Sequence, residues 1–151
     1  MVGMSRAYLL AERDVLTALK GDVALTAPDM VPASAIYGID PPVAPSWPFA
    51  KTTAPQGLPL NAACVRGAVI NFGLSAFTRG RGGVETARDH IVRIGEAIEN
   101  CLDGRNIEIL DVGRIAYTLA DVLIRADGDE PGAMHFSTTI RARVLGEVAQ
   151  S

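Results

Sequence analysis

Apolar residues recur at helical spacing in two stretches of the chain, and each stretch ends in a glycine. Residues 5–20 are followed by Gly21, and residues 84–103 are followed by Gly104. Apolar positions three and four apart line one face of a helix, and glycine is common just past a helix end. The sequence therefore predicts two amphipathic helices over these ranges.

Three further stretches, residues 64–78, 114–127 and 134–147, alternate apolar and polar residues with a period of two. This period predicts β-strands that have one buried side. The last two stretches are separated by the turn residues "DGDEPGA", which predict an antiparallel hairpin. A short strand is expected before the hairpin, near residues 107–110.

The alternation also predicts which side of each strand faces the core. In the last stretch the other side is polar and carries Arg141 and Arg143. The positions expected to face the core are Ile70, Phe72, Leu74 and Ala76 in the first stretch, Ile115, Tyr117, Leu119 and Leu123 in the second, and Phe136, Thr138, Ile140, Ala142 and Val144 in the third.

Eight of the nine prolines lie in residues 21–62. Proline lacks a backbone N–H and disfavours regular structure, so we expect an irregular segment here, with short strands at most, around residues 35–37 and 49–51. The segment also holds Trp47 and Phe49, which need an apolar surface to pack on. We therefore expect an extended arm or loop that lies on its own domain or on a neighbouring subunit.

These elements follow one another as helix, irregular segment, strand, helix and hairpin. Hairpins and isolated strands favour an α+β fold, an antiparallel β-sheet with two main helices packed on one face. The extended Pro-rich arm is an addition to this core. A chain of 151 residues fits one domain, over residues 1–151.

Composition limits the function only weakly. An apolar fraction of 48% argues for a folded chain, and a net charge of −3 gives no general reason to expect nucleic-acid binding. Only Lys20 and Lys51 among the basic residues are lysines. Arginine suits subunit interfaces and phosphate contacts, although a GC-rich genome produces the same bias. The N-terminal stretch lacks the apolar core of a signal peptide and no run is long enough to span a membrane, so we expect a soluble, cytoplasmic protein.

The stretch "FTRGRGG" (Phe77–Gly83) combines two arginines with three glycines. It lacks the lysine and Ser/Thr of a phosphate-binding P-loop and the spacing of a dinucleotide fingerprint. A single copy is also unlike the repeated RGG motifs of RNA-binding segments. Two interpretations remain, a flexible, positively charged loop before a helix or a plain strand-to-helix joint. We expect Arg79 and Arg81 to reach outward and contact another subunit or DNA.

Catalytic and metal-binding groupings are not recognisable in the sequence. His90 and His135 lack a second histidine or a cysteine at metal-ligand spacing, and "DGDE" lacks the residue order of a calcium loop. Cys64 and Cys101 are best explained as small buried apolar residues. We therefore predict no catalytic residue, no metal site and no cofactor.

The whole pattern resembles the tail completion or tail terminator family of siphophage-type viruses. The resemblance covers roughly residues 5–147 and rests on the order of five segments. They are the helix "AYLLAERDVLTALKGD", the pair "VPASAIYG" and "WPFAKTT", the strand "INFGLSAFTRGRGG", the helix "ETARDHIVRIGEAIENCLDG" and the hairpin strand "FSTTIRARVLGE". Gene transfer agents, which are phage-derived particles, carry similar proteins.

This resemblance implies a structural virion protein that is not an enzyme. The subunit would assemble with other copies into a ring, a hexamer, that caps the head-proximal end of the tail tube and joins the tail to the head connector. The implied partners are the major tail tube protein, the head-completion or connector protein and, non-specifically, the DNA in the channel, with no membrane. The protein would lie at the head–tail junction of the virion after assembly in the host cytoplasm. The candidate contact residues for a neighbouring subunit or the DNA channel are Arg79, Arg81, Arg141, Arg143, Trp47 and Phe49.

Two other functions stay open at this point. A small-molecule enzyme would use His90 or His135 as its base. A nucleic-acid-binding module would show strong salt dependence. It would use the arginines near the glycine loop, Arg79, Arg81, Arg88 and Arg93. The polar side of the last strand is alternatively a solvated sheet face.

Overall fold

The computed structural model of the chain describes the backbone of residues 2–53, 56–62, 65–109, 113–145 and 148–149, and side chains within 6–53, 69–109 and 113–145. Both predicted helices are confirmed. The helices are α1 (Met4–Lys20), α2 (Ala87–Leu102) and a short 3-10 helix (Ala33–Ala35). The strands are β1 (Val2–Gly3), β2 (Ile36–Tyr37), β3 (Phe49–Thr52), β4 (Gln56–Ala62), β5 (Val65–Thr78), β6 (Asn106–Ile109), β7 (Gly113–Ala126), β8 (Met134–Leu145) and β9 (Val148–Ala149).

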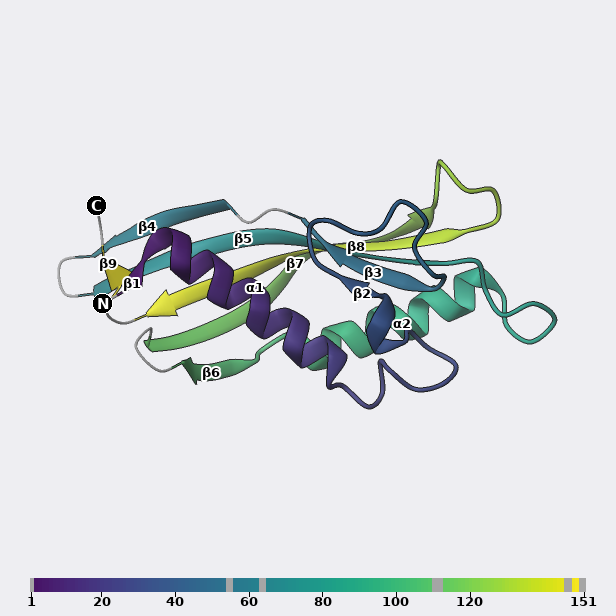
Figure 1. The fold of residues 1–151 in the computed structure, drawn as a ribbon, viewed down its shortest axis with the longest axis horizontal. Helices are drawn as coiled ribbons and strands as arrows, with labels where there is room; N and C mark the ends of the chain where they lie inside the picture. Colours follow the sequence, from purple (N-terminus) through teal and green to yellow (C-terminus); the bar gives the residue numbers. More distant parts are fainter. Residues whose placement is uncertain (1, 54–55, 63–64, 110–112, 146–147, 150–151) are drawn as a thin grey trace.

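Most of the strands form one seven-stranded, curled sheet (Figure 1). Its order is β2-β3-β5-β8-β7-β6, and β4 pairs with the part of β5 that β3 leaves free. The long strands β5, β8 and β7 are antiparallel neighbours, so the predicted hairpin and the predicted central strand are confirmed. The short strand β6 is also confirmed, and β1 and β9 form a separate parallel pair.

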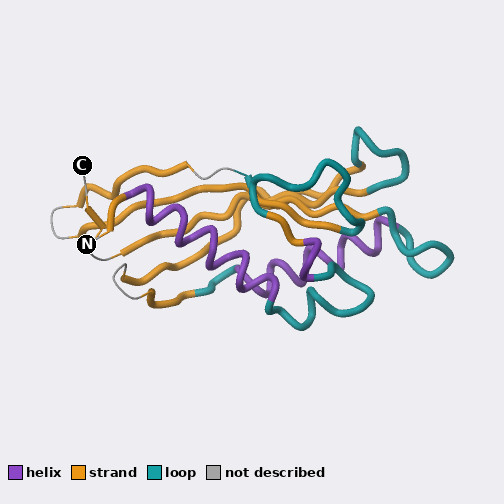
Figure 2. Tube along the Cα trace, viewed as in Figure 1, coloured by secondary structure: helices purple, strands orange, loops and turns teal. Residues whose placement is uncertain are grey.

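Both long helices lie on the same face of the sheet, which confirms the predicted α+β class (Figure 2). α2 packs against β5, β7 and β8, and α1 lies beside α2. We call the side of the sheet that neither of these helices covers the outer face. The core between helices and sheet contains Ala7, Ala11, Val15 and Leu19 of α1, Ile91, Ile94, Ile98 and Leu102 of α2, and Ile70, Phe72, Leu74, Phe136, Ile140 and Val144 of the sheet.

The close approach of α2 to β8 depends on Gly95. A Cβ atom at this position would lie 2.7 Å from Cδ2 of Phe136, nearer than carbon atoms pack. Glycine weakens the middle of a helix by about 1 kcal/mol relative to alanine. That cost is offset here because the missing side chain lets the Phe136 ring, which is fully buried, lie against the helix.

The extended Pro-rich arm is not confirmed. Leu25, Met30, Val31 and Ala35 are buried in the core, so the first part of this segment packs on its own chain. The predicted short strands are present as β2 and β3. The segment predicted to be irregular also contains the strand β4, which its proline makes unrecognisable in the sequence. Pro59 is compatible with β4 since that strand pairs only with β5 in the described structure, and an edge strand tolerates a missing N–H.

A β-bulge in β7 overturns one predicted side-chain orientation. The pairing with β8 shifts between Ala120 and Leu123, where Asp121 has a φ of 55°. An extra residue in one strand reverses the alternation beyond it. Leu123, predicted to face the core with Ile115 and Tyr117, therefore pairs with Ser137 on the outer face and is half-exposed.

Candidate interaction surfaces

The outer face carries mainly basic charge. At the paired positions of the described strands, its one acidic residue is Glu108, whose carboxylate lies 3.2 Å from Arg114. Arg141 and Arg143 lie on the central strand β8 and are both exposed. Arg141 donates only a long hydrogen bond, 3.4 Å, to the side chain of Asn71. Neither guanidinium group forms an ion pair with a described residue, and both can bind an acidic or phosphate-bearing partner.

One end of the outer face holds an aromatic cluster, formed by Trp47, Phe49, Phe77 and His135. The rings of Trp47 and Phe49 meet edge to face at 5.0 Å, and Phe49 stacks on Phe77 at 4.8 Å. Phe77 in turn stacks on His135, with ring centres 4.3 Å apart. These are favourable aromatic geometries, and they fix the strands and the loop before β3 to one another.

Arg79 points from the glycine loop toward this cluster. Its guanidinium carbon lies 4.3 Å from the centre of the Trp47 ring, and its Nε lies 3.1 Å from a carboxylate oxygen of Glu130. A cation–π contact of this kind contributes about 0.5–1 kcal/mol at an exposed site. Arg79, Trp47 and Phe49, three of the predicted contact residues, therefore lie together.

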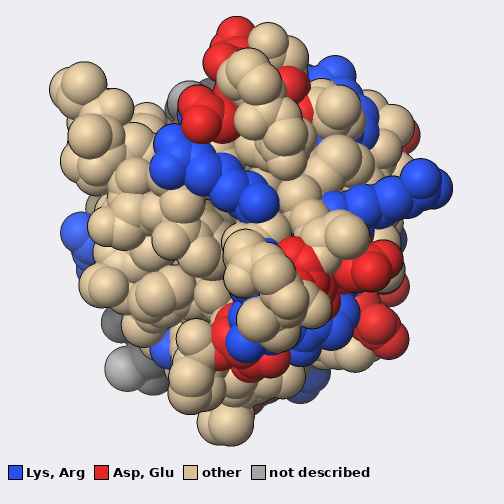
Figure 3. All heavy atoms as spheres, turned by 90° about the vertical axis from the view of Figure 1, so that its right-hand side faces the viewer, with Lys and Arg blue, Asp and Glu red and all other residues tan. Residues whose placement is uncertain are grey.

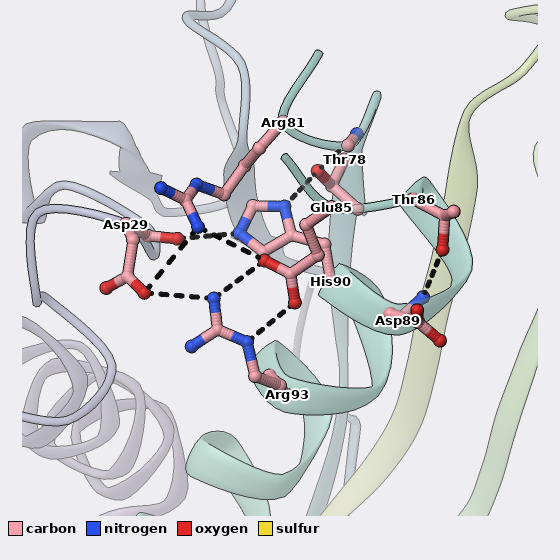
Figure 4. Close-up of polar contacts among 9 residues, drawn as sticks. Asp29, Thr78, Arg81, Glu85, Thr86, Asp89, His90 and Arg93 are labelled. Atoms are coloured by element: carbon pink, nitrogen blue, oxygen red, sulfur yellow. Dashed lines mark hydrogen bonds and ion pairs between the residues drawn. The ribbon is translucent and has the colours of Figure 1, made fainter. Parts of the chain in front are cut away.

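Arg81 points the other way, into a charge cluster that also contains Asp29, Glu85 and Arg93 (Figure 4). Arg93 donates from Nε to Glu85 at 2.7 Å and from Nη2 to Asp29 at 3.0 Å. The Arg81 Nη1 atom lies 3.6 Å from Glu85. The cluster lines an open hollow that Asp89 also borders, so three acidic and two basic residues lie there. This balance does not favour binding of an anion.

The charge cluster shifts the pKa values of its members. Hydrogen bonds from Arg93 lower the pKa of Glu85 to about 2, against a smaller opposing effect of burial. The same arginine lowers the pKa of Asp29. In return, the hydrogen bond to Glu85 raises the pKa of Arg93. The cluster is therefore fully ionised near neutral pH, with its charges paired inside the chain.

His90 connects the glycine loop to the rest of the fold. Its Nε2 lies 2.7 Å from the backbone oxygen of Asp29, and its Nδ1 lies 2.7 Å from the hydroxyl of Thr78 (Figure 4). A carbonyl oxygen only accepts, so Nε2 carries a proton, and in the neutral ring Nδ1 accepts the Thr78 proton. The Thr78 oxygen also accepts the N–H of Gly80. His90 is buried with both ring nitrogens bonded inside the chain, which does not suit a catalytic base.

The glycine loop, Phe77–Gly83, leads into a closed turn, and its two arginines form ion pairs with acidic residues of the same chain. Arg81 and Glu85 exchange two backbone hydrogen bonds of 2.8 and 2.9 Å. Gly80 has a φ of 83°, and a Cβ there would lie 2.7 Å from the backbone nitrogen of Ala87. The turn thus needs glycine at this position. In Figure 3, which views this end of the molecule, basic and acidic side chains adjoin one another.

The remaining candidate chemistry gives no site within the described residues. No group of three metal-ligating side chains comes together in that part of the chain. Burial, and then Arg125, lower the pKa of His135, and its buried Nε2 lacks a hydrogen-bond partner among the described atoms. Burial raises the pKa of the Cys101 thiol to about 12, so this cysteine is an inert, partly buried residue. Cys64 lies outside the described residues.

Several contacts of these surfaces are not visible in the sequence. The pairing of Phe77 with Phe49 and His135 depends on strand register, which is not visible in a single sequence. Asp29 meets Arg93 across 64 positions, so no local pattern indicates this ion pair. The spacing of Arg81 and Glu85 at i,i+4 was a usable signal, because they meet in the turn.

No described helix has the length and apolar character needed to span a membrane.

The chain matches one protein family in sequence and a solved structure in fold. The sequence profile of the family described as tail completion protein gp17 matches residues 13–145. Among solved structures, the chain is similar to a chain of the "Virion of native gene transfer agent (GTA) particle", with a TM-score of 0.71. The two chains are 19% identical, and the match covers 95% of this chain and 98% of the other. At this identity the likeness shows a shared fold. No curated protein sequence matches the chain.

Proposed function

The chain belongs to the family of tail completion protein gp17, and on this premise we propose that it forms the ring that completes a phage-type tail. As a member of this family it is a structural component of the virion tail, which assembles with other tail and head proteins. In the proposal, residues 1–151 act as a single tail-terminator domain. Six copies form a ring on the head-proximal end of the tail tube, stop its growth and join it to the head connector.

The observation that carries this proposal, beside the family, is the uncovered outer face. A ring on the tail tube surrounds the path of the DNA, and a sheet face with exposed Arg141 and Arg143 suits the wall of that path. Arginine contacts to phosphates bind without regard to sequence and weaken as salt rises. DNA can therefore pass along such a wall without being held at one site.

The fold likeness to a chain of a gene transfer agent virion supports the same role. That chain is part of a particle, and the likeness covers almost the whole of both chains. In the proposal, the partners are further copies of this chain, the major tail tube protein and the head-completion or connector protein. The proposed role needs no cofactor and no catalytic step.

The nucleic-acid-binding alternative has less support. Three of its four arginines, Arg79, Arg81 and Arg93, lie in ion pairs with acidic residues of the same chain. The enzyme alternative has less support too, because the nitrogens of His90 are both bonded to groups of its own chain.

The proposal is tested by adding the purified chain to tail tubes assembled from the cognate major tail protein. We expect electron microscopy to show a ring on one end of each tube, and we expect further elongation from that end to stop. Sheared tubes, which expose both kinds of end, provide the control for polarity. Tubes that stay bare and continue to grow at both ends would exclude the proposed role.

A further inference from the structure

We propose an interface between neighbouring copies of the chain, in which an exposed apolar segment of one copy binds a different exposed apolar segment of the next copy. One is the β7 edge, residues 120–126. The other is the Pro-rich loop, residues 38–46. This inference rests on the proposed ring, and it names the surfaces that would close that ring.

The β7 edge is an open and apolar strand edge. β6 pairs with β7 only up to Ala116, and in the described part of the chain no strand pairs with the same side of β7 beyond Tyr117. The same stretch holds three large apolar residues, Val122, Leu123 and Ile124, whose exposed fractions are 47%, 47% and 38%. An open edge with unpaired backbone groups and three consecutive large apolar residues attracts another chain. Natural proteins rarely leave such an edge unprotected, so we infer that it is covered in the assembled state.

The Pro-rich loop also presents exposed apolar side chains. Ile39 is about half-exposed, and Val43 is fully exposed. The base of the loop is fixed, because the Tyr37 hydroxyl accepts a hydrogen bond of 3.3 Å from the backbone of Ser46 and Trp47 belongs to the aromatic cluster. The loop is therefore held in place at its ends while its tip presents apolar side chains to the surroundings.

The positions of the two segments make a contact between copies possible. In the order of the sheet, β5 and β8 separate β7 from β3, and the loop joins β3 to its outer neighbour β2. Two different patches of one chain that bind each other between copies form a heterologous interface, and repetition of such an interface closes into a ring when the rotation between copies allows it. Contact between two β7 edges would instead give a two-fold dimer, whose faces are equivalent. A tail cap needs two different faces, one for the tube and one for the connector.

The chemistry of the two segments is complementary. Asp40 lies beside Ile39 in the loop and Arg125 lies beside Ile124 in the β7 edge, and these two exposed residues can form an ion pair between copies. The β7 edge also carries the exposed Asp121, beside Val122, at the end of the segment farther from Arg125. Unpaired N–H groups of the β7 edge need acceptors, which the carbonyl groups of the loop supply. The loop prolines, Pro41, Pro42 and Pro45, cannot donate to a further strand, so the contact ends after one addition.

Cysteine cross-linking tests the contact directly. In a background with Cys64→Ser and Cys101→Ser, the double variant Val43→Cys with Leu123→Cys is mixed with tail tubes and treated with a short bismaleimide. We expect a ladder of cross-linked multimers on a denaturing gel from the double variant. We expect only monomers from either single variant, because neither patch meets itself.

Three outcomes would overturn the inference. If the double variant caps tubes but gives no ladder, the ring is closed by other surfaces and only this inference fails. Dimers from Leu123→Cys alone would show that the β7 edge pairs with itself. If the parent protein neither associates nor caps tubes, the proposed function fails together with the inference.

A charge reversal provides an independent readout. We expect Asp40→Arg or Arg125→Asp alone to weaken association of the subunits by about threefold to tenfold, as measured by sedimentation. The double reversal should restore most of this loss, because the pair is reformed with its signs exchanged. Arg88→Asp, on the exposed side of α2, is the matched control and should leave association unchanged. Equal losses in the double reversal and the two single variants would contradict a direct contact between these residues.

Discussion

The two faces of the sheet differ in what they still require from other molecules. On β8, Phe136, Ile140 and Ala142 face the helices and are fully buried, whereas Arg141 and Arg143, their neighbours in sequence, remain exposed on the outer face. The residues of β5 and β8 that face the helices, from Ile70 to Thr78 and from Phe136 to Val144, are buried within one chain. These two arginines and the open edge of the sheet contribute little to folding. Their exposure is better explained by contacts that form during assembly.

Of the substitutions considered, Phe136→Ala on the covered face is expected to lower the free energy of unfolding most. Removal of a fully buried phenylalanine costs about 3–5 kcal/mol of unfolding free energy, because the cavity only partly closes. Chemical denaturation monitored by circular dichroism measures the loss. A cost below about 1 kcal/mol would show that the helices do not pack tightly on this face.

A second substitution sharpens this result. Gly95→Ala alone should cost about 1–3 kcal/mol, since its Cβ meets the Phe136 ring at 2.7 Å. In the Phe136→Ala background the same change should instead stabilise the protein by up to about 1 kcal/mol, because alanine favours the helix and the ring is gone. The same cost in both backgrounds would contradict the close contact.

The next effect is expected at His90, which joins the covered face to the glycine loop. His90→Ala leaves the Thr78 hydroxyl and the Asp29 carbonyl without their partner, at about 1–3 kcal/mol for each group that stays buried and unsatisfied. Thermal unfolding measures the change. Arg88→Ala, an exposed position on the same helix, serves as the control and should stay within about 0.5 kcal/mol of the parent.

A smaller effect is expected from acid on the charge cluster. The pKa of Glu85 is lowered to about 2 from an ordinary value of 4.5, so its charged form stabilises the fold above pH 4.5. That contribution is lost as pH falls from 4.5 toward 2, when the carboxylate takes up a proton and releases Arg93. Melting temperatures measured across this range should fall more steeply for the parent than for Glu85→Gln. Parallel curves for the two proteins would show that the ion pairs with Arg93 contribute nothing.

The smallest effect on stability is expected on the outer face. Arg141→Ala with Arg143→Ala should change the unfolding free energy by less than about 0.5 kcal/mol per site, because both side chains are exposed. In contrast, we expect the double variant to bind DNA fragments with a shallower salt dependence when assembled on tail tubes. An unchanged salt dependence would show that these arginines do not contact DNA and lie on a solvated sheet face.

The sequence predicted the covered face well, because buried apolar residues recur with the period of the strand or helix that carries them. The alternation in β5 and β8 and the three-and-four spacing in α2 identified the core residues correctly, among them Ile70, Ile94 and Phe136. The errors lie where a local feature breaks the period. The bulge at Asp121 reverses the orientation of Leu123. Pro59, a residue that disfavours strands, lies within β4, so the sequence of this segment does not indicate a strand. Single residues of this kind change backbone geometry without changing the surrounding pattern.

The candidate surfaces were only partly predictable for a different reason. Trp47, Phe49 and Arg79 were selected as unusual residues, but their meeting depends on the pairing of β3 with β5, a contact between distant parts of the chain. The ion pair of Arg81 with Asp29 joins residues that are far apart in the sequence. Whether a charge is free or paired is a property of the tertiary structure, and composition alone does not determine it.

Hydrogen–deuterium exchange of the free chain and of the chain bound to tail tubes tests the central claim most directly. Our account predicts that amides of β5, β8 and α2 are protected in both states, because the core residues of these elements are buried within one chain. It predicts that the β7 edge, residues 120–126, gains protection only on the tube, together with the Pro-rich loop, residues 38–46. Equal exchange of these two segments in both states, on tubes that the protein visibly caps, would contradict it.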